Sequence, residues 1–336
     1  MYDRYIITGA TGFLGRAVAE ELVRRGAQVY ALVLDNDPYK ALLPKEVKAV
    51  TGDVCTESTL ASLFEDADSR TCVIHCAGIV SVASRPGATI YQVNVGGTRN
   101  IIRQCTAHGV GRLIYISSVH AIPEKPFGRV MTEDCILSPG LVDGEYAKSK
   151  ASATELIFDA VQHGLSASVV FPSGIIGPGD VQCGSFTAMA KTFLAGKLPI
   201  AVHGGYDFVD VRDVANGILA CAESGESGKG YILSGHYATI RKMLRLLGKT
   251  ANVGYRPLCL PLWLAKLAAP YYEKHCLKGK KPLFFTPYSI AVLCSNGNFS
   301  NRKAARELGF HARPLKETLR STILWFQEQK LLSLTR

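Results

Sequence analysis

The sequence contains no apolar run long enough to cross a membrane and no low-complexity tract. A transmembrane helix requires about 20 consecutive apolar residues, so we expect no stable membrane insertion. The N-terminus enters a strand-like run at residues 5–7 with no charged and then apolar leader before it. Since a secretory signal has such a leader, we expect a cytoplasmic protein. A hydrophobic content of 47% also argues against a disordered chain.

Metal-site and disulfide patterns are also missing from the sequence. It has ten cysteines, but none forms a CxxC pair that is followed by a second such pair. We therefore expect scattered, buried thiols in a reducing compartment, with neither a metal site nor a disulfide framework.

Acidic residues are scarce in the C-terminal third. Residues 241–336 contain 18 Lys and Arg but 4 Asp and Glu, whereas the rest of the chain contains 20 and 24. The net charge of +10 therefore comes entirely from this third. A basic segment attracts an acidic substrate, a membrane surface or nucleic acid, and solvated helix faces explain it equally well. Since no basic and aromatic residues interleave as in a nucleic-acid groove, we expect no nucleic-acid partner.

Short apolar runs alternate with amphipathic stretches through the first half of the 336 residues. The expected strands cover residues 5–8, 29–33, 48–51, 72–75, 113–117 and 167–171. The expected helices cover residues 14–25, 58–64, 90–108 and 146–163. Alternating strands and helices predict an α/β fold, a doubly wound parallel Rossmann sheet with helices on both faces.

The alternation weakens after Pro172. A strand at 208–211, a helix at 214–223 and a strand at 231–233 are expected to return to the sheet. Residues 241–336 have a mostly helical pattern interrupted by prolines. We therefore predict a dinucleotide-binding domain of residues 1–173 plus 206–240. Residues 174–205 plus 241–336 are predicted to form a smaller, mostly helical substrate-binding cap.

Three glycines lie between the first predicted strand and the first predicted helix, in the pattern GxxGxxG. The first permits a tight turn, the second lets the backbone approach a pyrophosphate, and the third allows close packing of helix and strand. The helix N-terminus adds free N–H groups and the positive end of the helix dipole. The residues expected to bind the pyrophosphate of a dinucleotide are Gly9, Thr11, Gly12, Phe13, Leu14 and Gly15.

The end of the second predicted strand bears on the choice of cofactor. An acidic residue there hydrogen-bonds the ribose 2′-OH of NAD, whereas an arginine pairs with the 2′-phosphate of NADP. Asp35 lies 20 residues after Gly15, close to the expected spacing, although it also fits a turn with Asn36 and Pro38. The sequence thus favours NAD(H) slightly and leaves NADP(H) open.

Tyr146 and Lys150 form a YxxxK pair at the start of a predicted helix. The i, i+4 spacing places both side chains on one helix face. The positive charge of the lysine is expected to lower the pKa of the tyrosine, which suits a general acid or base. Ser117 and Ser118 end a predicted strand upstream, where a hydroxyl group can hold a substrate carbonyl beside the phenol.

These motifs resemble the extended short-chain dehydrogenase/reductase family, also called the NAD-dependent epimerase/dehydratase family. The resemblance covers residues 5 to about 240. The matching segments are TGATGFLG at 8–15, GDV at 52–54, HCAG at 75–78, NVGGT at 94–98, YISS at 115–118, YAKSK at 146–150, PSGIIGPGD at 172–180 and FVDVRDVA at 208–215. The segment from Asn298 to Phe326 resembles the branch that contains dihydroflavonol reductases and 3β-hydroxysteroid dehydrogenases.

The resemblance implies a catalytic role for Ser118, with Ser117 as the alternative, and for Tyr146 and Lys150. Tyr146 would be the acid or base, and Lys150 would also bind the nicotinamide ribose. Asn94 would brace the active site or cap a helix. Further cofactor contacts are implied for Asp53, Val54, Ala77, Gly78, Pro172 and Ser173.

The implied function is that of an NAD(P)-dependent oxidoreductase, which transfers hydride between the nicotinamide and a carbonyl or hydroxyl group of a hydrophobic small molecule. Apolar and aromatic residues at 257–285, together with residues 181–186, fit either a hydrophobic pocket for such a substrate or ordinary packing within the cap. The stretch 257–285 also suits dimerisation or contact with a membrane surface.

Two alternatives stay open: an NAD-dependent nucleotide-sugar epimerase, and a non-catalytic cofactor sensor or scaffold. Val119 and His120 follow Ser118 where dehydratases of the family place Asp and Glu, which argues against dehydration. The resemblance also implies a homodimer. The sequence identifies neither the substrate nor the direction of the reaction.

Overall fold

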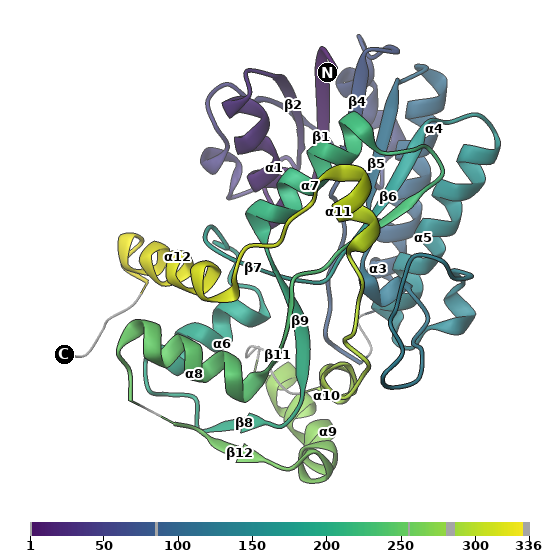
Figure 1. The fold of residues 1–336 in the computed structure, drawn as a ribbon. Coiled ribbons are helices and arrows are strands. Elements are labelled where there is room, and N and C mark those ends of the chain that lie inside the picture. Colours follow the sequence, from purple (N-terminus) through teal and green to yellow (C-terminus); the bar gives the residue numbers. More distant parts are fainter. Residues whose placement is uncertain (1, 85–86, 255, 280–285, 332–336) are drawn as a thin grey trace.

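A parallel seven-stranded sheet forms the centre of the protein, whose structure is a computed structural model that describes residues 2–84, 87–254, 256–279 and 286–331. Its strands are β1 (Arg4–Thr8), β2 (Gln28–Val33), β3 (Lys48–Thr51), β4 (Thr71–His75), β5 (Arg112–Ile116), β6 (Ala167–Pro172) and β10 (Gly230–Leu233). The strand order is β10-β6-β5-β4-β1-β2-β3, and every neighbouring pair is parallel (Figure 1). The predicted Rossmann sheet is therefore confirmed, with each predicted strand of the first half in place.

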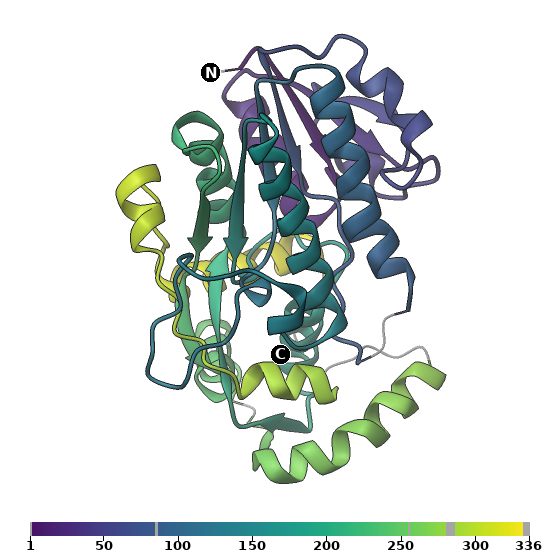
Figure 2. The ribbon, with the colours of Figure 1, turned by 90° about the vertical axis from the view of Figure 1, so that its right-hand side faces the viewer.

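Helices cover both faces of this sheet, because its strands are apolar on both sides. Ile7 of β1 belongs to one core with α1 (Phe13–Arg24) and α7 (Val211–Ser224). Its neighbour Ile6 belongs to the opposite core with α4 (Thr98–Ala107) and α5 (Glu145–Gln162), which lie on the face shown in Figure 2. Alternate side chains of one strand point to opposite faces, so two helical layers cover the sheet, except at the edge strand β3, which is mostly exposed.

The expected helix at 90–108 is three consecutive pieces: α3 (Thr89–Tyr91), the π-helical segment η3 (Gln92–Gly97) and α4. The expected helix at 58–64 is η2 (Glu57–Leu60) followed by α2 (Ala61–Phe64). Further 3₁₀ turns are η1 (Lys40–Leu42), η4 (Val119–Ala121) and η5 (Pro139–Leu141). A π-helical turn inside a helix is a frequent mark of a functional site.

The second part of the protein lies beyond the carboxyl ends of the strands (Figure 1). It contains a three-stranded sheet of β7 (Gly174–Ile176), β9 (Gly205–Asp210) and β11 (His236–Thr239), and a pair formed by β8 (Ile200–Val202) and β12 (Leu258–Leu260). Its helices are α6 (Ser185–Leu194), α8 (Ile240–Ala251), α9 (Leu262–Lys278), α10 (Pro287–Leu293) and α12 (Leu315–Glu328), whereas α11 (Arg302–Leu308) lies beside the main sheet. The C-terminal third is thus mostly helical, as predicted.

The expected return of a strand at 208–211 to the main sheet is wrong. That strand, β9, pairs instead with β11 and β7, while β10 occupies the edge beside β6.

The division into two domains stays a prediction. Although α11 comes from the segment assigned to the cap, it packs against α7 and β10 of the main sheet.

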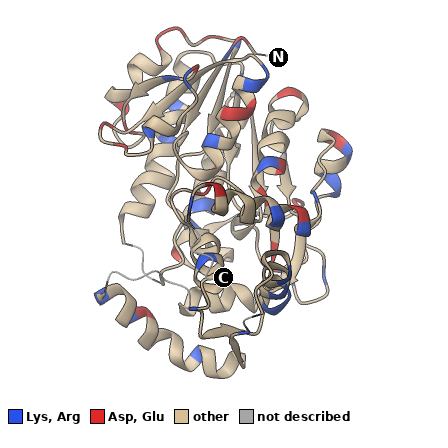
Figure 3. Ribbon diagram, turned by 90° about the vertical axis from the view of Figure 1, so that its left-hand side faces the viewer, with Lys and Arg blue, Asp and Glu red and all other residues tan. Residues whose placement is uncertain are grey.

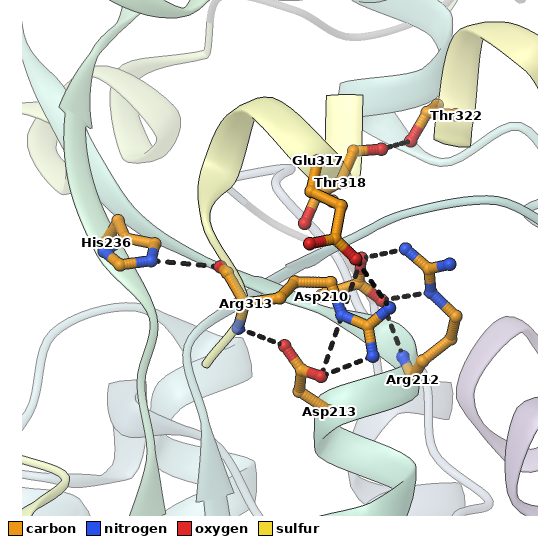
Figure 4. Close-up of polar contacts among 8 residues, drawn as sticks. All are labelled: Asp210, Arg212, Asp213, His236, Arg313, Glu317, Thr318 and Thr322. Atoms are coloured by element: carbon orange, nitrogen blue, oxygen red, sulfur yellow. Dashed lines mark hydrogen bonds and ion pairs between the residues drawn. The ribbon is translucent and has the colours of Figure 1, made fainter. Parts of the chain in front are cut away.

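Ion pairs attach the segment before α12 to the start of α7 (Figure 4). Asp210 caps α7 by accepting from the Arg212 backbone N–H at 2.9 Å, and it pairs with the Arg212 guanidinium at 2.7 Å. Arg313 pairs with Asp213 at 2.7 Å and lies 3.6 Å from Asp210. Burial raises the pKa of Asp210, but the bonds from Arg212 outweigh it and hold that pKa below its ordinary value. The paired charges therefore fix the C-terminal segment on the main sheet.

All ten cysteines are free thiols, but Cys55 and Cys183 are exposed, so the expectation of buried thiols is wrong for these two. Both lie in polar loops, where no apolar element covers them.

No helix within the described ranges has the length and apolar character needed to cross a bilayer. Nor do the described side chains include a group of three or more His, Cys, Asp or Glu that could hold a metal ion.

Candidate active site

The turn between β1 and α1 is so tight that only glycine fits at two of its positions. Gly9 has φ +69°, and a Cβ there would lie 2.7 Å from the backbone N of Ala77. A Cβ at Gly15 would lie 2.1 Å from the carbonyl oxygen of Gly9. Gly12 begins α1 without a side-chain cap, so the first N–H groups of the helix stay available to an anion. The loop therefore fits the pyrophosphate of a dinucleotide.

Two hydrogen bonds to backbone carbonyl groups join this glycine loop to the segment after β7. The Arg16 guanidinium, largely buried, donates to the carbonyl of Gly179, and the Gln182 amide donates to the carbonyl of Thr11 at 3.5 Å. Phe13 and Leu14, the other loop residues, are half-buried. The segment that follows β7 is thus held close to the expected phosphate site.

The carboxylate that contacts the glycine loop is Asp37, which the sequence analysis missed. Thr11 donates from its hydroxyl to Asp37 at 2.6 Å, and the Tyr39 N–H donates to the same carboxylate at 2.8 Å. Asp35 is exposed. The role of Asp35 at the ribose stays a prediction, and Asp37 acts as a brace for the loop.

The residues expected beside the adenosine lie where β3 and β4 end. Asp53 accepts from the N–H of Cys55 at 2.9 Å, and the buried Val54 packs so closely on Gly97 that a Cβ there would lie 2.8 Å from it. The Ala77 N–H donates to the Thr8 hydroxyl at 3.2 Å. Ligands of open α/β sheets bind at this carboxyl edge of the strands. The structure therefore brings the predicted cofactor residues to one edge, next to the glycine loop.

Gly78 lies directly against Lys150. A Cβ at Gly78 would lie 3.2 Å from both the Lys150 Nζ and the Asn94 Oδ1. Lys150 is buried; it donates to the carbonyl of Ile116 at 2.7 Å and to the Tyr115 hydroxyl at 3.4 Å. A side chain at position 78 would therefore press on both the lysine and Asn94.

Tyr146 and Lys150 project from the first two turns of α5, as the sequence predicted. Ser118 follows β5 and lies beside Tyr146, and its hydroxyl accepts from the His120 N–H at 3.2 Å. Ser117 instead shares a hydrogen bond of 2.8 Å with Thr154 in the interior of the protein. Of the two serines, Ser118 is the one that the structure brings to the tyrosine.

Burial controls the proton affinities of this group. It raises the pKa of Tyr146 to about 12, and the neighbouring Ser118 hydroxyl opposes this only in part. Burial also lowers the pKa of Lys150 to about 8. The expected lowering of the tyrosine pKa by the lysine is not seen, because the lysine ammonium is directed to the Ile116 carbonyl. At neutral pH Tyr146 is therefore a protonated phenol and Lys150 is mostly charged.

Asn94 braces the site and does not cap a helix. It lies within the π-helical segment, 1% exposed, and accepts from the Ile79 N–H at 2.7 Å. Its amide group donates to the Ile79 carbonyl at 3.1 Å and to the Ser149 hydroxyl at 2.9 Å. These bonds join the loop after β4 to α5, so Asn94 holds the lysine-bearing helix against the cofactor edge.

Three aromatic residues that the sequence analysis did not assign to the site surround the tyrosine. The His120 ring lies edge-on to Tyr146 at a centroid distance of 5.9 Å and stacks on Tyr206 at 5.6 Å. Its Nε2 lies 2.8 Å from the Tyr206 hydroxyl, and its centroid is 6.1 Å from that of Tyr288. Burial lowers the pKa of His120 to about 4, so the imidazole is neutral. Tyr206 and Tyr288 come from β9 and α10, far from Tyr146 in sequence, and no local motif marks them.

The hydroxyl of Tyr288 is buried and has no hydrogen-bond partner within the part of the chain that the structure describes. Gly144 makes room for its ring, because a Cβ there would lie 2.2 Å from the ring edge. A buried hydroxyl group without a partner is costly. It is therefore a group that a ligand could satisfy.

Ser173 follows Pro172 at the end of β6, and its side chain is buried. Its hydroxyl donates to Asp207 at 2.5 Å, and the Gly235 N–H donates to the same oxygen at 2.7 Å. Burial raises the pKa of Asp207 to about 6. The predicted contacts of Pro172 and Ser173 with the nicotinamide stay predictions, and Asp207 fixes this strand end to β9.

Comparison with known proteins places these features in context. The sequence model of the NAD dependent epimerase/dehydratase family matches residues 5–234. The chain is 28% identical to sterol demethylase protein B of Methylococcus capsulatus, over 97% of this chain and 99% of that protein. It is 29% identical to a putative dihydroflavonol 4-reductase of Synechocystis sp., over 97% and 95% of the two chains. Among solved structures, gox2253 superposes with a TM-score of 0.85 at 28% identity, covering 99% of this chain and 100% of that one.

Proposed function

This chain belongs to the NAD-dependent epimerase/dehydratase family, and we propose that it is an NAD(P)-dependent oxidoreductase that transfers hydride between the nicotinamide and a carbonyl or hydroxyl group of a hydrophobic small molecule. The observation that carries the proposal is the pair of neighbouring side chains Tyr146 and Ser118. This pair is buried, adjoins Lys150, and lies in the same structure as a glycine loop that fits a pyrophosphate.

The residues that would hold the cofactor are the glycine loop at its pyrophosphate and Lys150 at its nicotinamide ribose. The fit rests on the uncapped N-terminus of α1 and on Gly78, which places no side chain against the lysine ammonium. When bound, NAD supplies the carbon that gives or accepts the hydride. Its adenosine would lie beside Asp53 and Val54.

Tyr146 would act as the general acid in carbonyl reduction. With a pKa raised to about 12, its phenol keeps its proton at neutral pH and can pass it to the oxygen of a carbonyl group as that oxygen becomes an alkoxide. Ser118 would donate a hydrogen bond to the same oxygen and so hold it beside the phenol. Lys150 would hold the nicotinamide ribose, because its ammonium is directed to the Ile116 carbonyl and not to the phenol.

The surroundings of Tyr146 favour a hydrophobic substrate. His120 is neutral, and its ring, with those of Tyr206 and Tyr288, presents aromatic surface around the tyrosine. Such surfaces bind flat, apolar molecules, and a few polar groups fix their orientation. The buried Tyr288 hydroxyl is one such group. The names of the two relatives, a sterol demethylase protein and a putative dihydroflavonol reductase, support a polycyclic substrate.

A nucleotide-sugar epimerase is the second candidate, because the family whose model matches includes NAD-dependent epimerases. The joint presence of Tyr146 and Lys150 argues against a sensor or scaffold without activity. A homodimer and a cytoplasmic location remain part of the proposal.

The test is a screen that follows the absorbance of NADH and NADPH with steroid and flavonoid-like ketones and alcohols, with UDP-sugars alongside. We expect turnover of a polycyclic ketone or alcohol that requires added cofactor. Conversion of a UDP-sugar without added NAD would support the epimerase and contradict the proposal. The absence of any hydride transfer across the panel would contradict both.

A further inference from the structure

Helix α9 presents an apolar face to the outside of the protein. Figure 2 shows it as the outermost helix at the lower edge of the molecule. Its inner face, with Ala265 and Ala269, packs against Ile290 of α10 and Val202 of β8. Its outer face carries Trp263, Leu267 and Tyr271, which are 65%, 64% and 80% exposed. The described part of the chain leaves these three large side chains uncovered.

The three side chains form a continuous row. Their i, i+4, i+8 spacing places them one above another on the helix, opposite the buried row. Leu264 and Leu277 of the same helix, and Leu258 of the adjoining strand β12, are also exposed. We name Leu258, Trp263, Leu264, Leu267, Tyr271 and Leu277 the α9 face.

The charged side chains around the α9 face are positive. Lys266, Lys274 and Lys278 of α9 are exposed, whereas the one acidic residue of the helix, Glu273, is buried. Glu273 accepts from the backbone N–H of Ser84 at 2.8 Å and from its hydroxyl at 2.9 Å. Figure 3 shows the helix along the lower edge of the molecule with its lysines in blue. The helix thus combines an apolar row with positive charge on its outer side.

We propose that the α9 face docks on the surface of an anionic lipid bilayer, with α9 lying in the interface and not crossing the membrane. Trp and Tyr are enriched at the membrane–water interface, and an amphipathic helix with Trp and Leu on one side binds there. Lysine stems extend past apolar side chains so that their ammonium groups reach the lipid phosphates. Residues 241–336 contain 18 basic and 4 acidic residues, and this excess of positive charge complements an anionic surface. A second copy of the chain would bring the same lysines together, which disfavours a symmetric dimer through this face.

The α9 face is structurally connected to the candidate active site. α9 packs against α10, which carries Tyr288. The Glu273 carboxylate holds Ser84, and the Thr286 hydroxyl before α10 donates to the Val82 carbonyl at 2.5 Å, so both helices fix the loop that follows Gly78. Docking would therefore bring the side of the protein that carries α10 and Tyr288 to the lipid. Docking itself does not depend on the proposed function. Entry of a hydrophobic substrate from the bilayer rests on the proposed function.

The sequence contains two tryptophans, which makes the docking directly measurable. In a Trp325→Phe protein, Trp263 is the one tryptophan left, and it is exposed. Adding vesicles of phosphatidylcholine mixed with phosphatidylserine should shift its emission to the blue and make the protein float with the vesicles. Pure phosphatidylcholine vesicles should give a weaker response, and high salt should reduce binding to the anionic vesicles.

A triple variant tests the face itself. Trp263→Ser, Leu267→Ser and Tyr271→Ser together should lower vesicle binding at least about tenfold, because three apolar side chains that would be buried in the lipid are removed. A matched triple variant of exposed apolar residues elsewhere, Phe127→Ser, Ile136→Ser and Leu324→Ser, should bind as before. Equal thermal unfolding of the two variants shows that both are folded.

Absence of flotation with anionic vesicles would overturn the proposal, and so would equal flotation of the two triple variants. A loss of self-association in the α9 variant, without vesicle binding by the parent protein, would show that the face binds a second copy. If the proposed oxidoreductase activity fails while docking is observed, the fault lies with the proposed function alone.

Discussion

Replacing Gly15 by alanine should lower both the unfolding free energy of the protein and its affinity for NAD, because the glycine loop has no room for a side chain at this position. The new Cβ would lie 2.1 Å from the Gly9 carbonyl oxygen, whereas an ordinary contact begins at 3.4 Å, so α1 must move away by about 1.3 Å. Overpacking of this kind costs about 1–3 kcal/mol of unfolding free energy. It also displaces the N–H groups at the start of α1. Each hydrogen bond from them to a phosphate is worth about 1.5–3 kcal/mol, so NAD affinity should fall at least about tenfold.

The assay combines urea unfolding with calorimetric titration of NAD. Gly140→Ala is the matched control, because nothing lies within 4 Å of a Cβ at that position and its φ is not positive. The control should keep both its unfolding free energy and its NAD affinity. If Gly15→Ala bound NAD as tightly as the parent protein, the assignment of the pyrophosphate to this loop would be refuted.

Three further predictions concern groups around the site. Ser118→Ala should lower turnover by about a hundredfold, whereas Ser117→Ala should change mainly stability; equal losses of turnover would contradict the placement of the two hydroxyls. Asp207→Asn should stabilise the protein at pH 8 by at most about 3 kcal/mol, because a folded pKa of about 6 against an ordinary 3.8 means that ionisation opposes folding as the pH rises through that window. In urea unfolding this gain should vanish below about pH 4. Arg313→Met should cost about 3 kcal/mol at neutral pH, because the buried Asp213 loses its guanidinium partner while Asp210 keeps its pair with Arg212. Since the charge of Arg313 is one of the causes that hold the pKa of Asp210 low, part of that loss should disappear as the pH falls toward that pKa, and a pH-independent loss would contradict the ion-pair account.

Local patterns were enough to predict the central sheet and the main functional motifs. Apolar runs of 4–6 residues gave each strand of the first half to within about a residue or two, because parallel strands buried on both faces are continuously apolar. Tyr146 and Lys150 lie on one face of α5 as their spacing predicted. The positions of Gly9 and Gly15 follow from the close approach of helix and strand, which the motif itself encodes.

The failures share one cause, which is that they depend on contacts between distant segments. β9 has the composition of a strand, but composition does not say whether it pairs with β6 or with β11. Tyr206 and Tyr288 reach Tyr146 only because β9 and α10 fold back to it, so no spacing in the sequence marks them. The sign of the pKa shift of Tyr146 depends on its burial, and the charge of a neighbouring lysine predicted the opposite direction.

The most direct measurement of the central claim is single-turnover hydride transfer by a Tyr146→Phe variant, with NAD binding measured in parallel. The phenol hydroxyl is the group proposed to move the proton, so its removal should lower the rate of hydride transfer by roughly a hundredfold or more. NAD affinity should stay nearly the same, because the glycine loop and Lys150 are untouched. An unchanged rate of hydride transfer in this variant would contradict the role of Tyr146.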